Sequence, residues 1–353
     1  MAHTICTFNV NNLYVRYKFG QTFPGDMSGK SLVEDPQFGY LPIYKPELFD
    51  LFNPTQRELA GRAATNDKQD FPDVICLQEV ESLLALRRFN EEHLGEKYNY
   101  AILIDSRDFR QIDVGILSRL KIVNIRTHID DIDPSPANPG PPKPPEKPRL
   151  FSRDCLEVEI ALNGSGSKRL TLFINHLKSK LASTPAERQR ADELRKRQAQ
   201  AVKKTIESRF PGEQFNQEFF AVIGDLNDEP LSAPLKPLVS DAGLIDALAR
   251  FPKVEDRWTH WFKSENTVSQ LDHILLSPAL NAATTGKQPR IERRGIGFSR
   301  ILADGGPGPR LTHFHRMDDD PNPINLDFRF PRFTNITPEH FASDHCPVFL
   351  QVP

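Results

Sequence analysis

The chain has 353 residues, of which 38% are hydrophobic and 26% charged, a balance that is typical of a soluble globular protein with one large domain or two modest ones. Its formal net charge of −2 excludes a bulk basic field for nucleic acid, so any polyanion contact requires a local patch. No apolar run reaches the roughly 18–20 residues that span a bilayer.

The N-terminal sequence MAHTICTFNV lacks the basic and then apolar segments of a secretory signal, so we expect a cytoplasmic protein. Four cysteines, Cys6, Cys76, Cys155 and Cys346, lie beside or within apolar stretches and match no CxxC metal motif. We expect buried free thiols in a reducing compartment.

Short runs rich in Val, Ile and Phe predict strands along the chain, at 4–10, 73–79, 100–105, 113–118, 155–162, 169–175, 219–225, 271–276 and 346–352. Apolar residues at three-to-four spacing predict helices at 55–66, 81–94 and 185–209. The last begins with Thr184 as N-cap and Pro185 at the first helical position. This mixture indicates an α/β or α+β fold of stacked sheets and helices, in a single domain over residues 1–353.

Three segments interrupt this pattern. Residues 17–53 are rich in Gly, Pro and aromatic residues and are predicted to form a long loop. Residues 133–148 contain eight prolines, which favour a polyproline or exposed spacer. In the long insert at 284–340, arginine and aromatic residues are interleaved. They can bind phosphates and stack on bases, or they can pack against one another in an irregular flap. Both interpretations remain open.

Polar residues follow the strands at their carboxyl ends. They are Asn9 and Asn11 after TICTF, Glu79 ending DVICLQE, Asn175 and His176 ending LTLFINH, Asp225 and Asn227 ending FFAVIGDLN, Asp272 in QLDHILL, and Asp344 and His345 before CPVFLQV. Strand ends on one rim of a sheet system converge although they are distant in sequence. Because a buried carboxylate is costly unless it is paired or metal-bound, we expect these side chains to share one site.

The residue types indicate a chemistry. Carboxylate and amide oxygens suit a hard cation such as Mg²⁺ or Mn²⁺, which takes its remaining ligands from water and phosphate. Histidines can contact phosphoryl oxygens or protonate a leaving alkoxide, and a carboxylate beside an amide can deprotonate and orient water. This set predicts metal-assisted hydrolysis of a phosphoester.

Seven ordered motifs carry a resemblance over residues 4–352: TFNVNNL, ICLQEVE, DVGILSR, INHLKSK, GDLNDEP, QLDHILLSP and SDHCPVFL. Together they resemble the endonuclease/exonuclease/phosphatase superfamily, the deoxyribonuclease-I-like fold. The resemblance implies a four-layer sandwich, in which two packed mixed β-sheets are flanked by helices and the site lies at one end of the sheets.

The resemblance also implies roles for individual residues. It implies Glu79, Asn9 and Asp344 as metal-side ligands, and Asp225 and Asn227 as the residues that activate and position water. His345 is expected to contact the scissile phosphate and to be oriented by Asp272, while His176 assists the leaving group. The expected substrate-binding residues are Asn175, Asn11 and Arg110, the last being similar to an arginine found before this strand in many bacterial members.

Other polar residues favour simpler interpretations. Asp228 and Glu229 are predicted to be solvated turn acids after the strand. His273 neighbours Asp272 and should face the opposite side of the sheet, in a packing role, while His260 and the histidines of HFH (313–315) are interpreted as loop or packing residues. The basic residues of 185–209 favour a solvated helix face, with a polyphosphate-facing stripe as the minority interpretation.

We expect a nuclease or phosphodiesterase with a nucleic-acid or nucleotide-like substrate. QEVE replaces the QETK-like form usual in abasic-site repair enzymes, which disfavours that branch. A phosphatase, or a phospholipid or inositol-phosphate hydrolase of the same fold, remains an alternative. A calcineurin-like two-metal phosphoesterase fits GDLND but lacks its early DxH and later GNH[DE] motifs. A non-catalytic scaffold is disfavoured because the full polar set is present.

Overall fold

The computed structural model describes residues 2–13, 30–35, 39–44, 54–108, 110–133, 149–264, 267–297, 311–313, 324–326, 332–334, 336 and 340–353. Within these residues, no helix is both long and apolar enough to cross a membrane. The proline-rich stretch 134–148 and much of the 284–340 insert lie outside the described residues.

Two six-stranded mixed sheets form the centre of the molecule. The first sheet has the order β15 (Arg290–Ile291), β18 (Val348–Val352), β1 (His3–Leu13), β4 (Val74–Val80), β6 (Asp113–Ser118) and β5 (Tyr100–Leu103). The second has the order β11 (Ile245–Asp246), β14 (Asp272–Leu276), β10 (Phe220–Asp225), β9 (Arg169–His176), β8 (Leu156–Ala161) and β7 (Ile122–Arg126). The pairs β1–β4 and β9–β10 are parallel, so their carboxyl ends share a rim in each sheet.

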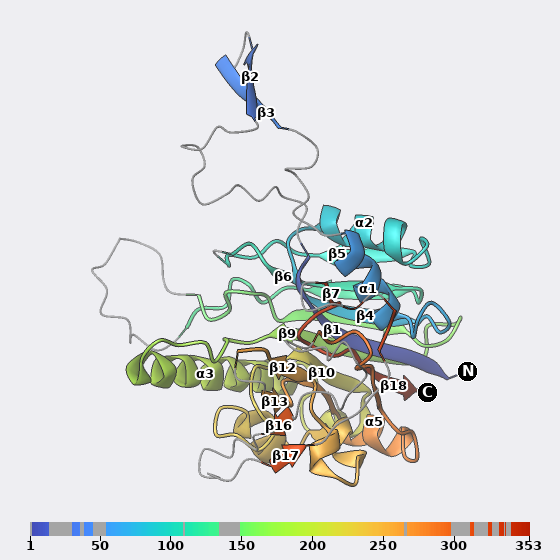
Figure 1. The fold of residues 1–353 in the computed structure, drawn as a ribbon. Coiled ribbons are helices and arrows are strands. Elements are labelled where there is room, and N and C mark those ends of the chain that lie inside the picture. The colour runs from blue at the N-terminus through green and yellow to red at the C-terminus, as the bar shows by residue number, and fades with distance from the viewer. Residues whose placement is uncertain are drawn as a thin grey trace.

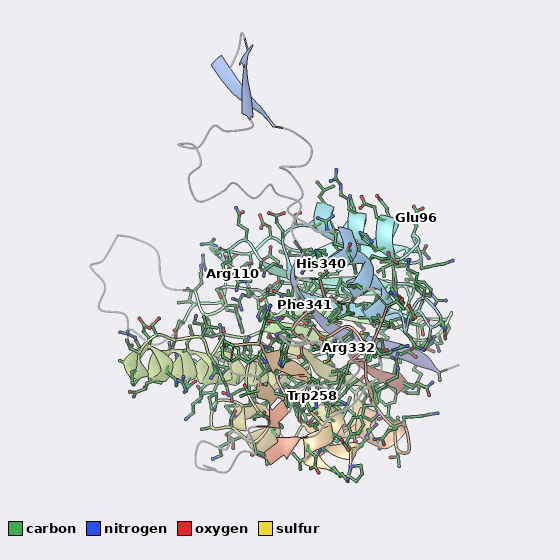
Figure 2. All side chains as sticks on the ribbon, viewed as in Figure 1. Glu96, Arg110, Trp258, Arg332, His340 and Phe341 are labelled. Carbon is green, nitrogen blue, oxygen red and sulfur yellow. The ribbon has the colours of Figure 1, made fainter. Side chains whose placement is uncertain are left out.

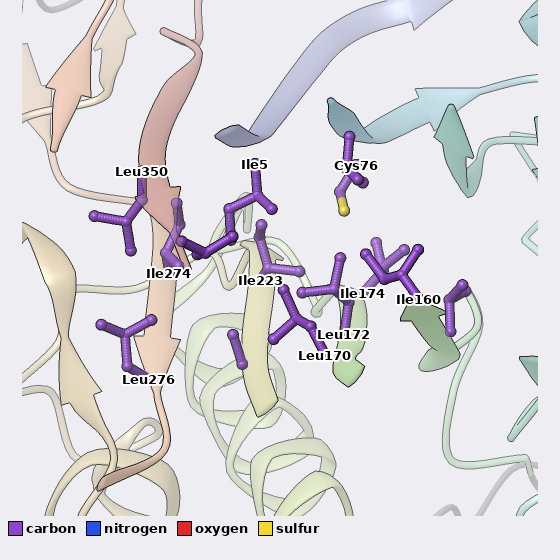
Figure 3. Close-up of a cluster of buried hydrophobic side chains, with 14 of the residues drawn as sticks. Ile5, Cys76, Ile160, Leu170, Leu172, Ile174, Ile223, Ile274, Leu276 and Leu350 are labelled. Carbon is purple, nitrogen blue, oxygen red and sulfur yellow. The ribbon is translucent and has the colours of Figure 1, made fainter. Parts of the chain in front are cut away.

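The sheets pack face to face and helices cover their outer faces (Figure 1). The central core lies between the sheets, where Ile5 and Cys76 of the first meet Ile174 and Ile223 of the second (Figure 3). Helices α1 (Pro54–Ala64) and α2 (Leu83–His93) pack on the first sheet through a second core. Helix α3 (Pro185–Arg209) packs on the second sheet through a third. The predicted four-layer sandwich is confirmed.

The helix α3 begins where the sequence predicts. Thr184 is its N-cap, Pro185 is its first residue, and the Thr184 side chain accepts a hydrogen bond from the Glu187 backbone N–H. The Glu187 side chain in turn accepts from the Thr184 backbone, which completes a capping box. The loop that precedes this helix starts directly after His176, the last residue of β9.

Several smaller elements were not predicted. A hairpin of β2 (Lys30–Asp35) and β3 (Gly39–Tyr44) lies within the segment 17–53, which was predicted to be a loop throughout. A four-stranded sheet joins β12 (His260–Phe262), β13 (Thr267–Ser269), β16 (Leu311–His313) and β17 (Ile324–Leu326). The short helices α4 (Gln214–Gln217) and α5 (Pro278–Ala283) were not predicted either.

The β12–β13 strands have a small core of their own, made by Trp258, Trp261, Val268, Ile296 and Cys346. Trp258 lies on the same side of the molecule as these strands (Figure 2). Because Cys346 follows His345 directly, this core fixes the segment that carries His345. All four cysteines are free and buried, as predicted.

Candidate active site

Three strands of the second sheet place three polar side chains in one row. Asp225, at the end of β10, pairs in register with His176 of β9 on one side and with Asp272 of β14 on the other. All three are at least 96% buried, with exposed fractions of 4% for His176, 1% for Asp225 and 0% for Asp272. His176 Nε2 lies 3.4 Å from Asp225 Oδ2. The row therefore brings an acid into contact with a histidine in a site that excludes most water.

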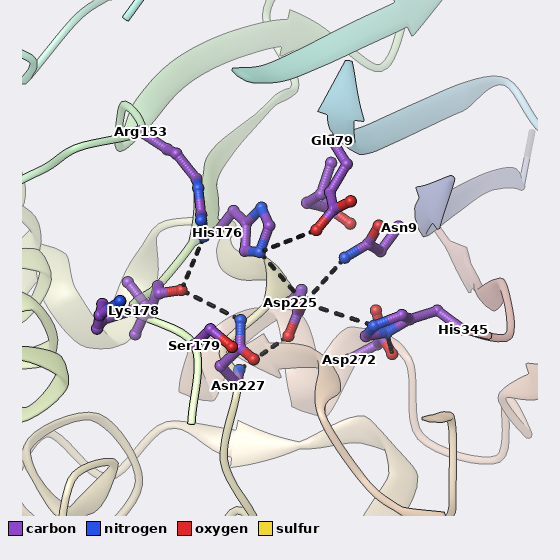
Figure 4. Close-up of polar contacts among 12 residues, drawn as sticks. Asn9, Glu79, Arg153, His176, Lys178, Ser179, Asp225, Asn227, Asp272 and His345 are labelled. Carbon is purple, nitrogen blue, oxygen red and sulfur yellow. Dashed lines mark hydrogen bonds and ion pairs between the residues drawn. The ribbon is translucent and has the colours of Figure 1, made fainter. Parts of the chain in front are cut away.

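The first sheet contributes Asn9 and Glu79 from the ends of its parallel strands β1 and β4. Asn9 Nδ2 donates to Asp225 Oδ2 at 3.0 Å, which links the two sheets directly (Figure 4). Glu79 has a φ of +64°, and the β4 register shifts between Gln78 and Val80. This bulge brings the Glu79 carboxylate to 4.0 Å from His176 Nε2.

His345 reaches the row from the segment before β18. Its Nδ1 lies 2.8 Å from Asp272 Oδ2, and its Nε2 lies 3.8 Å from Asp225 Oδ2. The Ser343 hydroxyl accepts from the His345 backbone N–H and donates to the Asn9 backbone oxygen, which ties this segment to β1. Asp344 lines the cleft beside it.

The turn after β10 holds Asn227 in place. Its backbone N–H donates to Asp225 Oδ1 at 2.8 Å, and its Nδ2 donates to the Leu177 carbonyl at 3.1 Å. Arg153 donates to the same carbonyl and to Asp108. The two loops after His176 and Asp225 are thus held together, and Asn227, whose Nδ2 is used in this contact, lines the cleft.

The two histidines of the row differ in charge. Burial opposes the charged form of His345, but the carboxylates of Asp272 and Asp225 raise its pKa to about 10. Burial, together with the charges of Arg153 and His345, lowers the pKa of His176 well below its usual value. At neutral pH the site therefore holds a cationic His345 beside a neutral His176.

Glu79 has the surroundings of a cation ligand. Burial raises the pKa of its carboxyl group, the nearby Arg110 opposes that shift, and Asp344 raises the pKa again by like-charge repulsion. Arg110 Nη2 lies 3.4 Å from Glu79 Oε2. A divalent cation between the Glu79 and Asp344 carboxylates would relieve both the burial and the repulsion, and their oxygens are the donors that Mg²⁺ prefers.

A second cluster also fits a divalent cation. Donor atoms of Asp225, Asp272 and His345 all lie within 4.8 Å of one another, and the three residues are buried. The second carboxylate oxygen of Asp272 is buried with no hydrogen-bond partner. The hydrogen bond from His345 to Asp272 already joins two members of this cluster, so a proton on His345 supplies positive charge there.

These side chains line a cleft of about 400 Å³. Ten of the eleven predicted site residues line it or contact its lining: Asn9, Asn11, Glu79, Arg110, His176, Asp225, Asn227, Asp272, Asp344 and His345. Asp272 supports His345 from beneath. The structure does not bring Asn175 to the cleft, because it faces the α3 side of β9, where it donates to the Phe173 carbonyl.

The cleft also contains residues that were not predicted to belong to the site: Arg153, Lys180, Arg188, Glu229 and His260. The ring of His260, in β12, lies 4.5 Å from the ring of His345, so this histidine packs against a site residue. Lys180 and Glu229 lie four residues beyond the ends of β9 and β10, while Arg153, Arg188 and His260 follow none of the predicted strands directly. His273 is fully buried and its Nε2 donates to the Asp228 carbonyl at 2.8 Å, in the predicted packing role.

Two predictions are corrected. Asp228 and Glu229 are not solvated turn acids, because their exposed fractions are only 3% and 7%. Asp228 forms ion pairs with Arg195 and Lys180, and Glu229 accepts a hydrogen bond from the Gln270 backbone. Arg195 itself is fully buried, so α3 does not present a uniformly solvated basic face.

Three described arginines of the 284–340 insert pack against aromatic rings. Arg290 lies over Phe349, Arg293 over Trp258 and Arg294 over Phe333, with guanidinium carbons 3.8 to 4.8 Å from the ring centroids. For these three residues the structure favours the packing interpretation over phosphate binding.

A two-sheet sandwich with an acid, amide and histidine cleft at one rim defines a metal-dependent phosphoester hydrolase of the deoxyribonuclease-I-like class. The sequence profile of the Endonuclease/Exonuclease/phosphatase family matches residues 6–345, and the chain belongs to this family.

Solved structures share the fold at low sequence identity. The catalytic domain of human nocturnin aligns with a TM-score of 0.54 at 12% identity, covering 100% of this chain and 94% of that one. An endonuclease/exonuclease/phosphatase family protein of Bacteroides thetaiotaomicron aligns at 0.52 and 15%, covering 100% and 97%. SmcL aligns at 0.50 and 14%, covering 100% and 99%. A search of curated proteins gives no match.

Proposed function

We propose that this protein is a Mg²⁺- or Mn²⁺-dependent nuclease or phosphodiesterase that cleaves a phosphodiester by in-line attack of water. The observation that carries the proposal is the position of Asp225, whose carboxylate contacts Asn9, His176, Asn227 and His345 in one buried cleft. These partners come from both sheets, so the chain concentrates polar groups on this one acid.

Asp225 is the base in this proposal. Its Oδ1 is fixed by the Asn227 backbone N–H, and the Asn227 amide oxygen can orient the attacking water because its Nδ2 is held by Leu177. The cationic His345, oriented by Asp272, stabilises charge that develops on the phosphoryl oxygens. Neutral His176 can hydrogen-bond the phosphate or the departing oxygen.

We assign the cation to Glu79, Asn9 and Asp344, since their donors are all oxygens and His345 already neutralises the Asp225–Asp272 pair. A bound Mg²⁺ would supply Lewis acidity toward a phosphoryl oxygen. Arg110, beside Glu79, and Asn11 lie on the cleft wall where they can contact the substrate.

The test is a substrate panel with the stripped protein and added Mg²⁺ or Mn²⁺: single- and double-stranded DNA, RNA, bis-p-nitrophenyl phosphate, a phosphomonoester and sphingomyelin. We expect phosphodiester cleavage, and a loss of about 10³-fold or more in kcat for Asp225→Ala and His345→Ala with folding intact. Asp241→Asn, a surface carboxylate paired with Lys236 outside the cleft, is the control.

Two outcomes would overturn the proposal. Equal activity of the parent and both variants on every phosphoester would favour a scaffold protein. A requirement for tightly bound Zn²⁺ or Fe, with no response to millimolar Mg²⁺, would favour a two-metal phosphoesterase instead.

A further inference from the structure

We propose that Lys180 and Arg188 form a second phosphate subsite in the cleft, so that the substrate is an oligonucleotide chain and not a molecule with a single phosphate. This inference rests on the proposed function and names its substrate class. Both residues line the same cleft as Asp225 and His345.

Lys180 is held in place by two buried residues. Its ammonium group forms an ion pair with Asp228 Oδ1, and its side chain is 23% exposed. Asp228 Oδ2 accepts from Arg195 Nε at 2.9 Å, and Arg195 Nη1 donates to the Lys178 carbonyl at 2.8 Å. Arg195 and Asp228 are both more than 90% buried, so this support is built into the protein and not a chance surface contact.

The support leaves positive charge on the cleft wall. Asp228 is a single carboxylate shared by two cations, Arg195 and Lys180, and a lysine ammonium has three donors. Arg195 also pairs with Asp192, which is 39% exposed on the solvent side, where water screens its charge. Lys180 can therefore donate to a phosphate while it keeps its contact with Asp228.

Arg188 adds a second cation in the first turn of α3. Within the described chain no carboxylate lies within ion-pair distance of its guanidinium group, and the residue is exposed. Glu229, an acid that also lines the cleft, is mostly protonated at neutral pH because burial raises its pKa to about 8. The wall is thus cationic, although the whole chain carries a net charge of −2.

The cleft also has an apolar lining that suits a nucleobase. Phe262, Val268 and Leu181 line it together with the two cations, and Leu181 is 78% exposed. Bases stack on aromatic and apolar surfaces while the backbone follows a positive groove. The cationic choline head group of a phospholipid would be repelled by Lys180 and Arg188. A polyol phosphate has no apolar group that could contact Phe262, Val268 or Leu181.

The first measurement is binding of a fluorescein-labelled thymidine octanucleotide by anisotropy in EDTA, which does not depend on turnover. We expect Lys180→Ala and Arg188→Ala each to weaken binding by about 3- to 10-fold and to reduce the slope of log K against log salt by about 0.7 per lost phosphate contact. Lys203→Ala is the matched control. The Lys203 side chain is 25% exposed and also forms one ion pair, with Glu207, but it lies outside the cleft.

The second measurement compares turnover of the octanucleotide and of a dinucleoside monophosphate, which has one phosphate. Lys180→Ala should lower kcat/KM for the octanucleotide about tenfold and leave the single-phosphate substrate within about twofold. Equal losses on both substrates, or unchanged binding and salt slope, would overturn the subsite.

Two further results separate the subsite from the proposed function. If the octanucleotide binds through Lys180 but no phosphoester is cleaved, the subsite stands and the proposed function fails. If inositol hexakisphosphate displaces the octanucleotide completely and binds more tightly, the second phosphate belongs to a small polyphosphate and the oligonucleotide assignment is wrong.

Discussion

At the scale of single residues, two adjacent acids in one turn have opposite electrostatic surroundings. Asp228 has two cationic partners, Arg195 and Lys180. Glu229 has a hydrogen bond from the Gln270 backbone, while burial and the neighbouring Asp228 and Asp246 raise its pKa to about 8. A sequence pattern of two acids in a turn does not distinguish these cases, because the partners come from distant parts of the chain.

Glu229 should make the stability of the protein depend on pH. Its folded-state pKa, about 8, lies above its unfolded value, so the folded state binds more protons and the stabilising contribution is lost as pH rises through about 8. We expect Glu229→Gln to leave the free energy of unfolding nearly unchanged at pH 5 and to raise it at pH 9, by on the order of 4 kcal/mol. Denaturant titrations at the two pH values measure this.

The control for this prediction is Glu193→Gln, on the exposed face of α3. A Glu229→Gln variant that tracks the parent at both pH values would show that Glu229 is ionised in the folded protein at neutral pH.

At the scale of elements, the site depends on how closely β9 and β10 approach each other. Gly224, just before Asp225, has a φ of +139°, and a Cβ built there would lie 1.9 Å from the Asn175 backbone oxygen. Glycine allows the two parallel strands to pair up to their last residues, which places His176 beside Asp225. The backbone requirement of Gly224 is thus part of the site geometry.

Gly224→Ala should therefore destabilise the protein by at least about 3 kcal/mol, because both the backbone conformation and the steric contact are unfavourable. Gly243→Ala is the matched control: Gly243 also has a positive φ, +69°, but no atom within 4 Å of the added Cβ. It should cost only about 1 kcal/mol. Similar losses in the two variants, measured by denaturant titration, would mean that the β9–β10 contact can relax.

At the scale of the whole molecule, the cleft exists only when both sheets are packed together. The first sheet supplies Asn9 and Glu79, and the second supplies His176, Asp225 and Asp272 (Figure 4). The core between the sheets fixes their relative position. Any ligand that binds residues of this rim is thereby coupled to global folding.

A cation at Glu79 should consequently raise the thermal stability. Mg²⁺ at about 100 times its dissociation constant should stabilise the folded state by about 2.7 kcal/mol, a rise in Tm of a few degrees for a chain of this size. We expect Glu79→Gln to abolish most of this rise and Asp272→Asn to keep it, as measured by calorimetry with and without Mg²⁺. The reverse result would assign the cation to the Asp225–Asp272–His345 cluster.

Much of this arrangement could be predicted from the sequence because strand ends are local features. The runs ending at Glu79, His176 and Asp225 show their strand character in Val, Ile and Phe content, and the polar residue after each run marks the rim. The alternation rule that predicts His273 opposite Asp272 applies equally to Asn175 and His176. The structure obeys it at both pairs, which is why Asn175 lies away from the cleft.

The remaining site residues were beyond local patterns. Arg195 reaches Asp228 across 33 residues of sequence, and Arg153 reaches Asp108 across 45. His260 comes to His345 through a three-residue strand, which is too short for a periodicity signal. Such contacts depend on how the layers pack, so sequence periodicity carries no information about them.

The left-handed backbone conformation of Glu79 sets the stability of the folded protein against its proposed catalytic role. A glutamate at a φ of +64° costs roughly 1 kcal/mol or more relative to a favourable conformation, whereas glycine adopts this geometry freely. Glycine at position 79 would therefore relieve the backbone strain, but glycine has no side chain that could bind a cation. Selection for heat resistance alone should drive this position toward glycine, and retention of glutamate under such selection would measure how strongly activity is required.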